Sequence, residues 1–276
     1  MRNATVLLLA TSLLAAACGG RANGRTRVVA AFYPLAFAAE QIGGSRVDVE
    51  NITPPGAEPH DVELAPRDVA DVQRADVVLY LSHGFQPSLE DAVKGAQGKR
   101  VDVLGGIALR GDDPHVWLDP VLFARVVQRI GTALGAPRRA AALGARLRAL
   151  DRSYRVGLAR CARHDFITSH AAFGYLAARY GLRQIAITGI DPESEPSPKR
   201  LRSLVDLVRR QHITTVFFER LVSPRLADTI ARDAGAQARV LDPIEGLTKT
   251  EEQHGDDYFT LIRRNLRALR AALGCR

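Results

Sequence analysis

Residues 138–160 read RRAAALGARLRALDRSYRVGLAR. The leucines of this stretch recur at the spacing of one helix face, which predicts a single helix over several turns. These residues are Leu143, Leu147, Leu150 and Leu158. A helix of this length is about twice as long as the average helix of a globular protein. We therefore expect residues 135–162 to form a connecting helix between two halves of the protein.

On both sides of the connecting helix, short apolar runs alternate with helical segments. The runs before it are residues 27–32, 47–52, 77–81 and 100–104, and those after it are 166–168, 184–187, 215–218 and 239–241. Parallel neighbouring strands need crossover connections, so this alternation predicts a parallel sheet in each half. The expected fold class is α/β, with two four-stranded β/α lobes at residues 27–134 and 163–276.

The composition is that of an ordinary globular protein. The chain has 276 residues, of which 46% are hydrophobic and 25% are charged, and its formal net charge is +8. These values exclude a disordered tail, a collagen-like repeat and a polytopic membrane protein. The positive charge leaves nucleic acid or an anionic membrane open as a partner.

The amino-terminal residues predict export and a lipid anchor. Residues 1–18 read MRNATVLLLATSLLAAAC, in which the uncharged stretch is too short to cross a bilayer as a helix. Residues 1–17 are typical of a signal peptide, and small residues directly before Cys18 resemble a bacterial lipobox, although Leu14 lies four residues before the cysteine. We expect lipidation at Cys18, a tether over residues 18–26 and an extracytoplasmic, membrane-anchored protein. The alternative is an ordinary signal peptide that happens to precede Cys18.

Three histidines lie in the loops after predicted strands, and one aspartate directly ends the last predicted strand. His60 lies in GAEPHD, His115 in DDPHVWLD, His170 in ITSHAAFG and Asp242 in VLDPIEG. In open parallel sheets, ligands bind beyond the carboxyl ends of the strands, so two facing lobes would bring these side chains together. Three imidazole nitrogens and one carboxylate oxygen suit tetrahedral Zn²⁺, whereas Mn²⁺ prefers more oxygen ligands. The sequence therefore predicts a zinc site in the cleft, with manganese or another divalent ion as the alternative.

Several other polar residues are weaker candidates. Glu219 follows a predicted strand, and we expect it to accept a hydrogen bond from a metal-binding histidine or else to be structural. Glu195, in SEPSP, is a second candidate for such support or a helix cap. Glu58 is a minor ligand candidate, and His83 is expected to be a loop histidine at the rim of the cleft.

Taken together, these motifs resemble the zinc-type solute-binding proteins of bacterial metal ABC importers, a group that also contains manganese binders. The resemblance rests on GAEPHDVELAPRDV, DPHVWLDP, TSHAAFGYLAARYGL, EPSPKRL and VLDPIEG followed by GDDYFTLIRRNL, and it covers nearly the whole mature chain. It implies two β/α lobes, a rigid connecting helix and one metal ion held in the cleft by His60, His115, His170 and Asp242.

The chain departs from the family pattern in three places. His170 stands where manganese-type relatives carry glutamate, which favours zinc. The loop at residues 105–114 is short and lacks the histidine-rich insertion of many zinc-type members. Pro59 occupies the position directly before the first histidine, where some zinc-type members carry glutamate.

Two cysteines remain once Cys18 carries a lipid. Cys161 ends the connecting helix and Cys275 is the penultimate residue, and an oxidising compartment favours a disulfide between them. Two free thiols or a cysteine-metal site are the alternatives. Neither cysteine follows a strand at the predicted cleft.

The predicted function is high-affinity capture of Zn²⁺ and its delivery to an ABC permease by a monomeric protein that is not an enzyme. Manganese delivery in the same family is the first alternative. An extracytoplasmic zinc hydrolase is a second, although no HExxH sequence is present and a fourth protein ligand would close the site to water. Nucleic-acid binding is a third, but the arginines are spread over helices without an aromatic RNA motif, so we expect no nucleic-acid partner.

Overall fold

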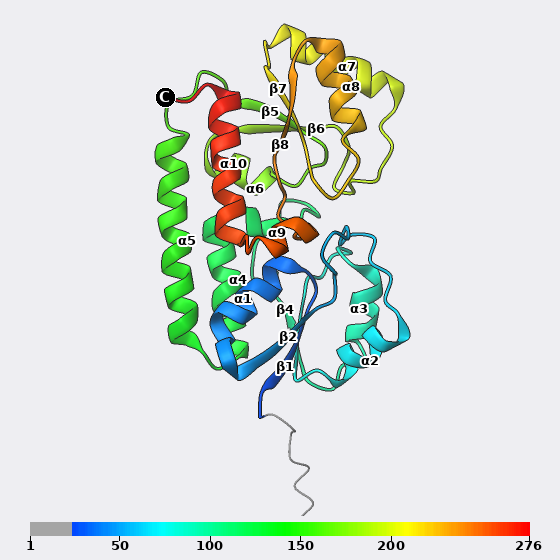
Figure 1. The fold of residues 1–276 in the computed structure, drawn as a ribbon, viewed down its shortest axis with the longest axis vertical. Helices are drawn as coiled ribbons and strands as arrows, with labels where there is room; N and C mark the ends of the chain where they lie inside the picture. Colours follow the sequence, from blue (N-terminus) through cyan, green and yellow to red (C-terminus); the bar gives the residue numbers. More distant parts are fainter. Residues whose placement is uncertain (1–23) are drawn as a thin grey trace, which may run out of the picture.

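The computed structural model describes residues 24–276, which form two four-stranded parallel sheets bridged by one long helix (Figure 1). The predicted signal peptide and Cys18 lie outside the described residues, as does most of the predicted tether. No helix within residues 24–276 combines the length and the apolar character needed to cross a membrane.

The amino-terminal sheet has the strand order β2-β1-β3-β4. Its strands are β1 (Thr26–Ala30), β2 (Val47–Asn51), β3 (Val77–Tyr80) and β4 (Lys99–Asp102). The helical elements between these strands are α1 (Tyr33–Gly43), η1 (Gly44–Arg46), α2 (Pro66–Arg74) and α3 (Pro87–Val93), and η2 (Val116–Leu118) and α4 (Pro120–Ala133) follow β4. Apolar strands such as VVLY in β3 are buried on both faces, as expected when helices cover a parallel sheet.

The carboxy-terminal sheet repeats this arrangement with the order β6-β5-β7-β8. Its strands are β5 (Asp165–Thr168), β6 (Arg183–Ala186), β7 (Thr215–Phe218) and β8 (Gln237–Val240). Its helices are α6 (Gly174–Arg179), α7 (Pro198–Arg210), α8 (Arg225–Ala234), α9 (Lys249–Gln253) and α10 (Tyr258–Leu273). All eight strands were expected from the sequence, and the two-lobed α/β fold is confirmed. The short helices α3 and α9 were not predicted.

The connecting helix α5 (Pro137–Gly157) runs along one edge of the molecule beside both lobes (Figure 1). Pro137 occupies its first turn, where a missing backbone N–H costs nothing. The predicted leucines face inward, and Leu143, Leu147 and Leu150 are all buried. At the start of the preceding helix, Asp119 accepts hydrogen bonds from the backbone N–H groups of Val121 and Leu122, as its position before Pro120 predicts.

Helix α10 lies beside α5, and its first residues pack against the amino-terminal lobe (Figure 1). The ring of Tyr258, at its start, lies 4.7 Å from the ring of Phe123 and 5.8 Å from that of Phe37. The hydroxyl of Tyr154 on α5 donates a hydrogen bond to the carbonyl of Ile262 at 2.6 Å. One continuous hydrophobic core therefore includes α10, α5 and the amino-terminal sheet.

A disulfide joins Cys161 and Cys275 across 114 residues of sequence. It confirms the pairing expected from the cysteine count. The bond attaches the segment after α10 to the segment after α5, so both helices are fixed together at the same end of the molecule.

Candidate metal centre

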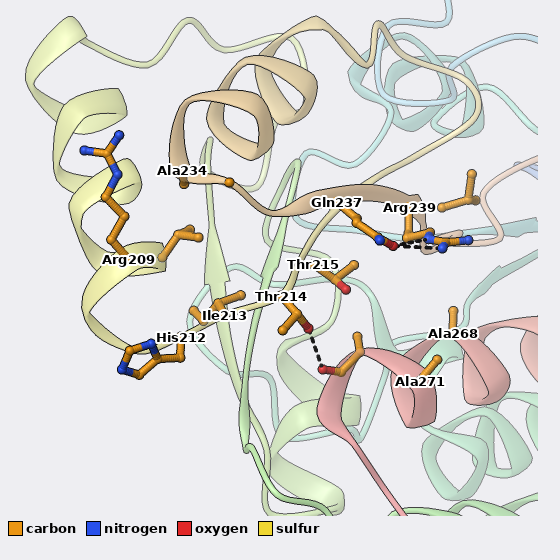
Figure 2. A pocket seen from close by; sticks show the side chains of 14 residues that line it. Arg209, His212, Ile213, Thr214, Thr215, Ala234, Gln237, Arg239, Ala268 and Ala271 are labelled. Atoms are coloured by element: carbon orange, nitrogen blue, oxygen red, sulfur yellow. Dashed lines mark hydrogen bonds between the residues drawn. The ribbon is translucent and has the colours of Figure 1, made fainter.

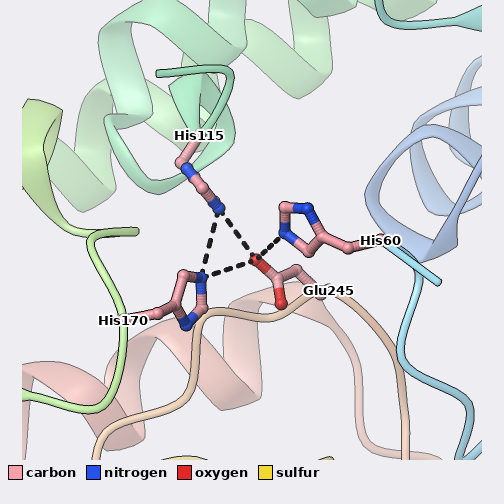
Figure 3. A group of neighbouring side chains, drawn as sticks. All are labelled: His60, His115, His170 and Glu245. Atoms are coloured by element: carbon pink, nitrogen blue, oxygen red, sulfur yellow. Dashed lines mark hydrogen bonds and ion pairs between the residues drawn. The ribbon is translucent and has the colours of Figure 1, made fainter. Parts of the chain in front are cut away.

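Four side chains from four different loops meet between the two lobes (Figure 3). His60 follows β2, His115 follows β4, His170 follows β5 and Glu245 follows β8. Each loop begins at the carboxyl end of its strand, so the two sheets present these ends to a common space. The amino-terminal lobe supplies two imidazoles, and the carboxy-terminal lobe supplies one imidazole and one carboxylate.

The candidate ligand atoms of these four side chains lie within 4.8 Å of one another. Oε1 of Glu245 is 3.1 Å from Nε2 of His115, 3.4 Å from Nε2 of His170 and 3.7 Å from Nε2 of His60. The Nε2 atoms of His115 and His170 are 3.3 Å apart. Zinc-to-ligand bonds of about 2.0–2.1 Å place neighbouring tetrahedral ligands about 3.3 Å apart. The observed spacing therefore fits one Zn²⁺ ion at the centre of the group.

The group is buried and its inward atoms lack ordinary partners. His115, His170 and Glu245 are each at most 1% exposed, and the side chain of His60 is 9% exposed. Nε2 of His60 and both carboxylate oxygens of Glu245 are buried and make no hydrogen bond within the described residues, although Oε1 of Glu245 lies at ion-pair distance from the three imidazoles. Buried polar groups without partners are costly, and a bound cation would satisfy these three atoms together.

Two carboxylates orient the buried imidazoles from outside the group. Nδ1 of His170 lies 2.8 Å from Oε1 of Glu219, and Nδ1 of His115 lies 2.7 Å from Oδ1 of Asp113. Such contacts fix the tautomer of a metal-binding histidine and leave its Nε2 free to bind the ion. The contact of Glu219 was predicted from the sequence, whereas that of Asp113 was missed.

Charge within the cluster shifts the pKa of each buried group. Burial alone would lower the pKa of His170, but the carboxylates of Glu219 and Glu245 hold it well above its usual value. The pKa of His115 is raised in the same way, against the effect of burial, by Asp113 and Glu245. Burial would raise the pKa of Glu245, but the three histidines, His170 foremost, hold it well below its usual range. Without an ion, these shifts favour the ionised form of Glu245 and the protonated forms of His115 and His170.

Asp242, the predicted fourth ligand, is not one of the four clustered side chains, whose carboxylate is that of Glu245. Its Oδ1 accepts a hydrogen bond from the backbone N–H of Ile244 at 2.7 Å, and its Oδ2 lies 3.7 Å from Nε of Arg220. The side chain of Asn265 on α10 bonds both the N–H and the C=O of Asp242. Burial raises the pKa of Asp242 to about 7.

The turn between Asp242 and Glu245 explains why the later carboxylate enters the cleft. Ile244 has a φ of 58°, in the left-handed region that a β-branched residue rarely adopts. The N–H of Ile244 bonds Asp242 on one side of this residue, and Glu245 on its other side lies among the histidines. Both carboxylates follow β8 in the sequence, and this turn separates the one that joins the group from the one that does not.

The remaining candidates lie outside the group. Glu195 is exposed and makes no hydrogen bond or ion pair within the described part of the chain, so its predicted supporting role has no structural counterpart. His83 is exposed, as expected of a rim histidine. Oε1 of Glu58 accepts a hydrogen bond from the backbone N–H of His60 at 2.9 Å, and burial together with Glu245 raises the pKa of Glu58 to about 8.

Aromatic residues link the loops that carry the group. The ring of Trp117 lies 5.0 Å from the ring of His115, and its Nε1 donates a hydrogen bond to the carbonyl of Pro243 at 2.7 Å. The hydroxyl of Tyr258 donates to the carbonyl of Trp117 at 2.6 Å. The ring of Phe85 lies 4.6 Å from the ring of His60 and 5.6 Å from that of Trp117. Trp117 therefore ties the loop of His115 to the loop of Glu245 across the lobes.

A separate cavity of about 820 Å³ lies in the carboxy-terminal lobe, between α7, α8 and α10 (Figure 2). It is lined by residues near the amino ends of β7 and β8, including His212, Thr214 and Gln237. The hydroxyl of Thr214 donates to the carbonyl of Ala272, and the guanidinium of Arg239 donates to Gln237. This cavity lies at the opposite end of the strands from the four clustered side chains and holds no comparable ligand set.

Comparison with known proteins identifies the family. The family model of zinc-uptake complex component A, periplasmic (ZnuA), matches residues 28–272. The chain is 34% identical to the zinc-binding lipoprotein AdcA of Streptococcus pneumoniae over 96% of its own length and 60% of that protein. It is 33% identical to the high-affinity zinc uptake system protein ZnuA of Bacillus subtilis, over 97% of its own length and 96% of the relative. The chain thus spans about 60% of the length of AdcA and nearly all of the Bacillus protein.

Solved structures agree with this result. The Zn(II)-bound ZnuA-like domain of Streptococcus pneumoniae AdcA superposes with a TM-score of 0.79 at 35% identity, covering 91% of this chain and 99% of that one. The laminin-binding protein Lmb of Streptococcus agalactiae, described as an adhesin with metal-transporting activity, superposes with a TM-score of 0.83 at 31% identity, covering 90% and 99%. The chain belongs to the ZnuA family of zinc-uptake components.

Proposed function

We propose that the protein captures one Zn²⁺ ion with His60, His115, His170 and Glu245 and delivers it to an ABC permease. The observation that carries the proposal is the buried group of three imidazole nitrogens and one carboxylate at tetrahedral spacing. The family membership and the zinc-binding names of the relatives support the same ion. Zinc is the cargo here, so the site must both bind it and release it.

The donor set favours zinc over manganese. Three nitrogen ligands suit zinc, and a single carboxylate supplies less oxygen than manganese sites usually have. The same donor set also disfavours a zinc hydrolase, because the fourth protein ligand occupies the position that a catalytic zinc keeps for water. The protein is therefore proposed to be a binding protein rather than an enzyme.

Release of the zinc ion is expected to involve movement of the ligand-bearing loops more than separation of the two lobes. The four donors come from both lobes, so the ion cannot leave while all four loops stay in place. The hydrogen bonds of Trp117 with Pro243 and Tyr258, together with α10 packed on the amino-terminal lobe, resist separation of the lobes. We expect movement of the loops of His60 or Glu245 to open the site.

The proposed location is the outer face of a cell membrane, with a lipid on Cys18 and a monomeric body. The sequence pattern around Cys18 supports the lipid, and the relative named a lipoprotein is consistent with it. Mass spectrometry of the purified, membrane-extracted protein tests the lipid: a diacylglyceryl-modified Cys18 at the amino terminus supports it, and an unmodified terminus rejects it.

Elemental analysis and chelator competition test the metal. The wild-type protein is expected to bind one equivalent of zinc, and His170→Ala is expected to weaken that binding strongly. His83→Ala is the matched control, because His83 is an exposed histidine outside the group. Preferential binding of manganese, or equal zinc affinity in wild type and His170→Ala, would contradict the proposal.

A further inference from the structure

We infer that the exposed face of α5, together with the neighbouring arginines of α10, is a docking surface for an anionic lipid bilayer. This surface, the helical spine, comprises the exposed residues of Pro137–Gly157 and Tyr258–Leu273. It lies away from the metal cleft, along the edge of the molecule where the two helices run side by side (Figure 1).

The charge of the protein is concentrated on the spine and the residues that follow its helices. Residues 137–163 and 258–276 contain 13 arginines and a single acidic residue, Asp151. The rest of the chain has 25 lysines and arginines against 29 acidic residues, so it is slightly negative. Asp151 is buried and pairs with Arg155, so the spine presents no exposed carboxylate.

The spine arginines form stripes along both helices. On α5, Arg148, Arg152 and Arg155 are exposed and recur at intervals of four and three residues, which places them on one side of the helix. On α10, the exposed arginines have the same spacing. They are Arg263, Arg267 and Arg270. The guanidinium groups of Arg148, Arg152 and Arg267 make no hydrogen bond or ion pair within residues 24–276. They are therefore available to a partner.

Beside the arginine stripe, α5 exposes a strip of small and apolar side chains. It consists of Ala142, Ala145, Ala149 and Val156, which recur at intervals of three, four and seven residues. Val156 is 76% exposed and is the one exposed large hydrophobic side chain in the described part of the chain. Small and apolar side chains beside arginines let the helix approach a bilayer closely, with its guanidinium groups at the phosphates.

The length and position of the spine also suit a membrane. A helix of 21 residues is about 30 Å long, so it can contact many headgroups at once. The start of β1 and the start of α5 lie at the same end of the molecule (Figure 1). The residues from Cys18 to Thr26 span at most about 28 Å. This reach depends on the proposed lipid anchor, whereas the charge and the apolar strip of the spine do not depend on it.

Vesicle co-sedimentation tests the inference without the lipid. A chain that begins at Gly19 is used, because both sheets and the core lie within residues 24–276. It is expected to bind phosphatidylcholine vesicles that contain phosphatidylglycerol, to leave pure phosphatidylcholine vesicles unbound, and to dissociate as salt is added.

Two charge-reversal variants with the same net charge separate the spine from the rest of the surface. The spine variant carries Arg148→Glu, Arg152→Glu and Arg267→Glu, and it is expected to bind the anionic vesicles at least about tenfold more weakly. The control variant carries Arg202→Glu, Arg210→Glu and Arg225→Glu, all at exposed positions of α7 and α8, and it is expected to stay within about twofold of wild type. Zinc titration confirms that both variants fold. If the spine variant does not fold, the single change Arg152→Glu is compared with Arg202→Glu, with about fivefold weaker binding expected.

Four results would overturn the inference. The first is an equal loss of binding in the spine and control variants, and the second is equal binding to vesicles with and without phosphatidylglycerol. The third is complete displacement of the protein from the vesicles by duplex DNA, which would indicate that the arginines bind nucleic acid. The fourth is a dimer in sedimentation velocity that Val156→Asp dissociates, which would assign the strip to a second copy of the chain.

Discussion

Nδ1 of His170 lies 2.8 Å from Oε1 of Glu219, in the interior of the carboxy-terminal lobe. Both side chains are buried, so the imidazole is held with its other nitrogen, Nε2, toward Glu245. His115 has the same relationship with Asp113 in the amino-terminal lobe. Each lobe therefore prepares one histidine for the ion before the ion arrives.

Replacing Glu219 with glutamine should weaken zinc binding by about 10–100-fold, because the carboxylate that orients His170 loses its charge. Chelator competition on the purified protein measures the change. Glu195→Gln is the control, since Glu195 is exposed and makes no hydrogen bond or ion pair in the described chain, and it should bind zinc as the wild type does. Equal affinities for the two variants would contradict the role of Glu219.

The carboxylates of Asp242 and Glu245 should respond differently to amide substitution. Glu245→Gln removes a proposed ligand, and we expect zinc affinity to fall by more than the 10–100-fold typical of supporting residues. Asp242→Asn keeps an oxygen that can accept the N–H of Ile244, and we expect less than about a tenfold change. A large loss in Asp242→Asn with little change in Glu245→Gln would restore the assignment made from the sequence.

Zinc affinity should fall with decreasing pH, and the fall should begin above pH 6.5. The pKa values of His115 and His170 are raised in the metal-free protein, so protons must leave these imidazoles before zinc binds. Zinc titrations between pH 5 and 9, at constant ionic strength, measure the profile. A profile that stays flat down to pH 6.5 would show that the imidazoles are neutral without the ion.

The stability of the metal-free protein should show the opposite trend with pH. The pKa of His170 is raised on folding, so its contribution to stability is complete below about pH 6.5 and is lost as the pH rises through the folded-state pKa. The raised pKa of Asp242, about 7, also reduces stability as the pH rises from the ordinary value of 3.8 toward 7. The melting temperature without zinc should therefore decrease across this range, and His170→Ala should flatten its upper part.

Removing the disulfide should destabilise the fold and leave zinc binding intact. For a closed loop of 114 residues, the chain-entropy estimate is about 4–5 kcal/mol, as an upper value. Urea unfolding of the double variant Cys161→Ser and Cys275→Ser, compared with the wild type, measures the loss. Because the bond joins the far ends of α5 and α10, a large decrease in zinc affinity would contradict its purely structural role.

Zinc binding should change the intrinsic fluorescence of the protein. Trp117 is the sole tryptophan of the chain, is buried, and has its ring 5.0 Å from the ring of His115. Loss of the proton from this imidazole on binding changes the charge beside the indole. Fluorescence titration should saturate at one equivalent of zinc in the wild type and show no such endpoint in His60→Ala.

The sequence predicted the fold and three of the four clustered side chains because both depend on local signals. Strands such as β3 are short and apolar, and each histidine lies in the loop that follows a strand. The fourth side chain depends on the conformation of Ile244, whose positive φ is not suggested by its residue type. Asp113 was missed because its role depends on the rotation of the His115 ring. The position of the Asp113 side chain also depends on Gly174 in the other lobe, since a Cβ there would lie 2.8 Å from Oδ2 of Asp113.

The packing of the start of α10 against the amino-terminal lobe affects the order in which the chain folds. Phe37 and Phe123 complete their packing only against Tyr258, which lies more than a hundred residues later in the sequence. The first lobe therefore remains unfinished until the last helix has been synthesised, although its sheet is assembled from residues 26–102. Contacts of such long sequence separation slow folding. The amino-terminal lobe and α10 are therefore expected to fold together, and a fragment that ends after α5 should not attain the native core.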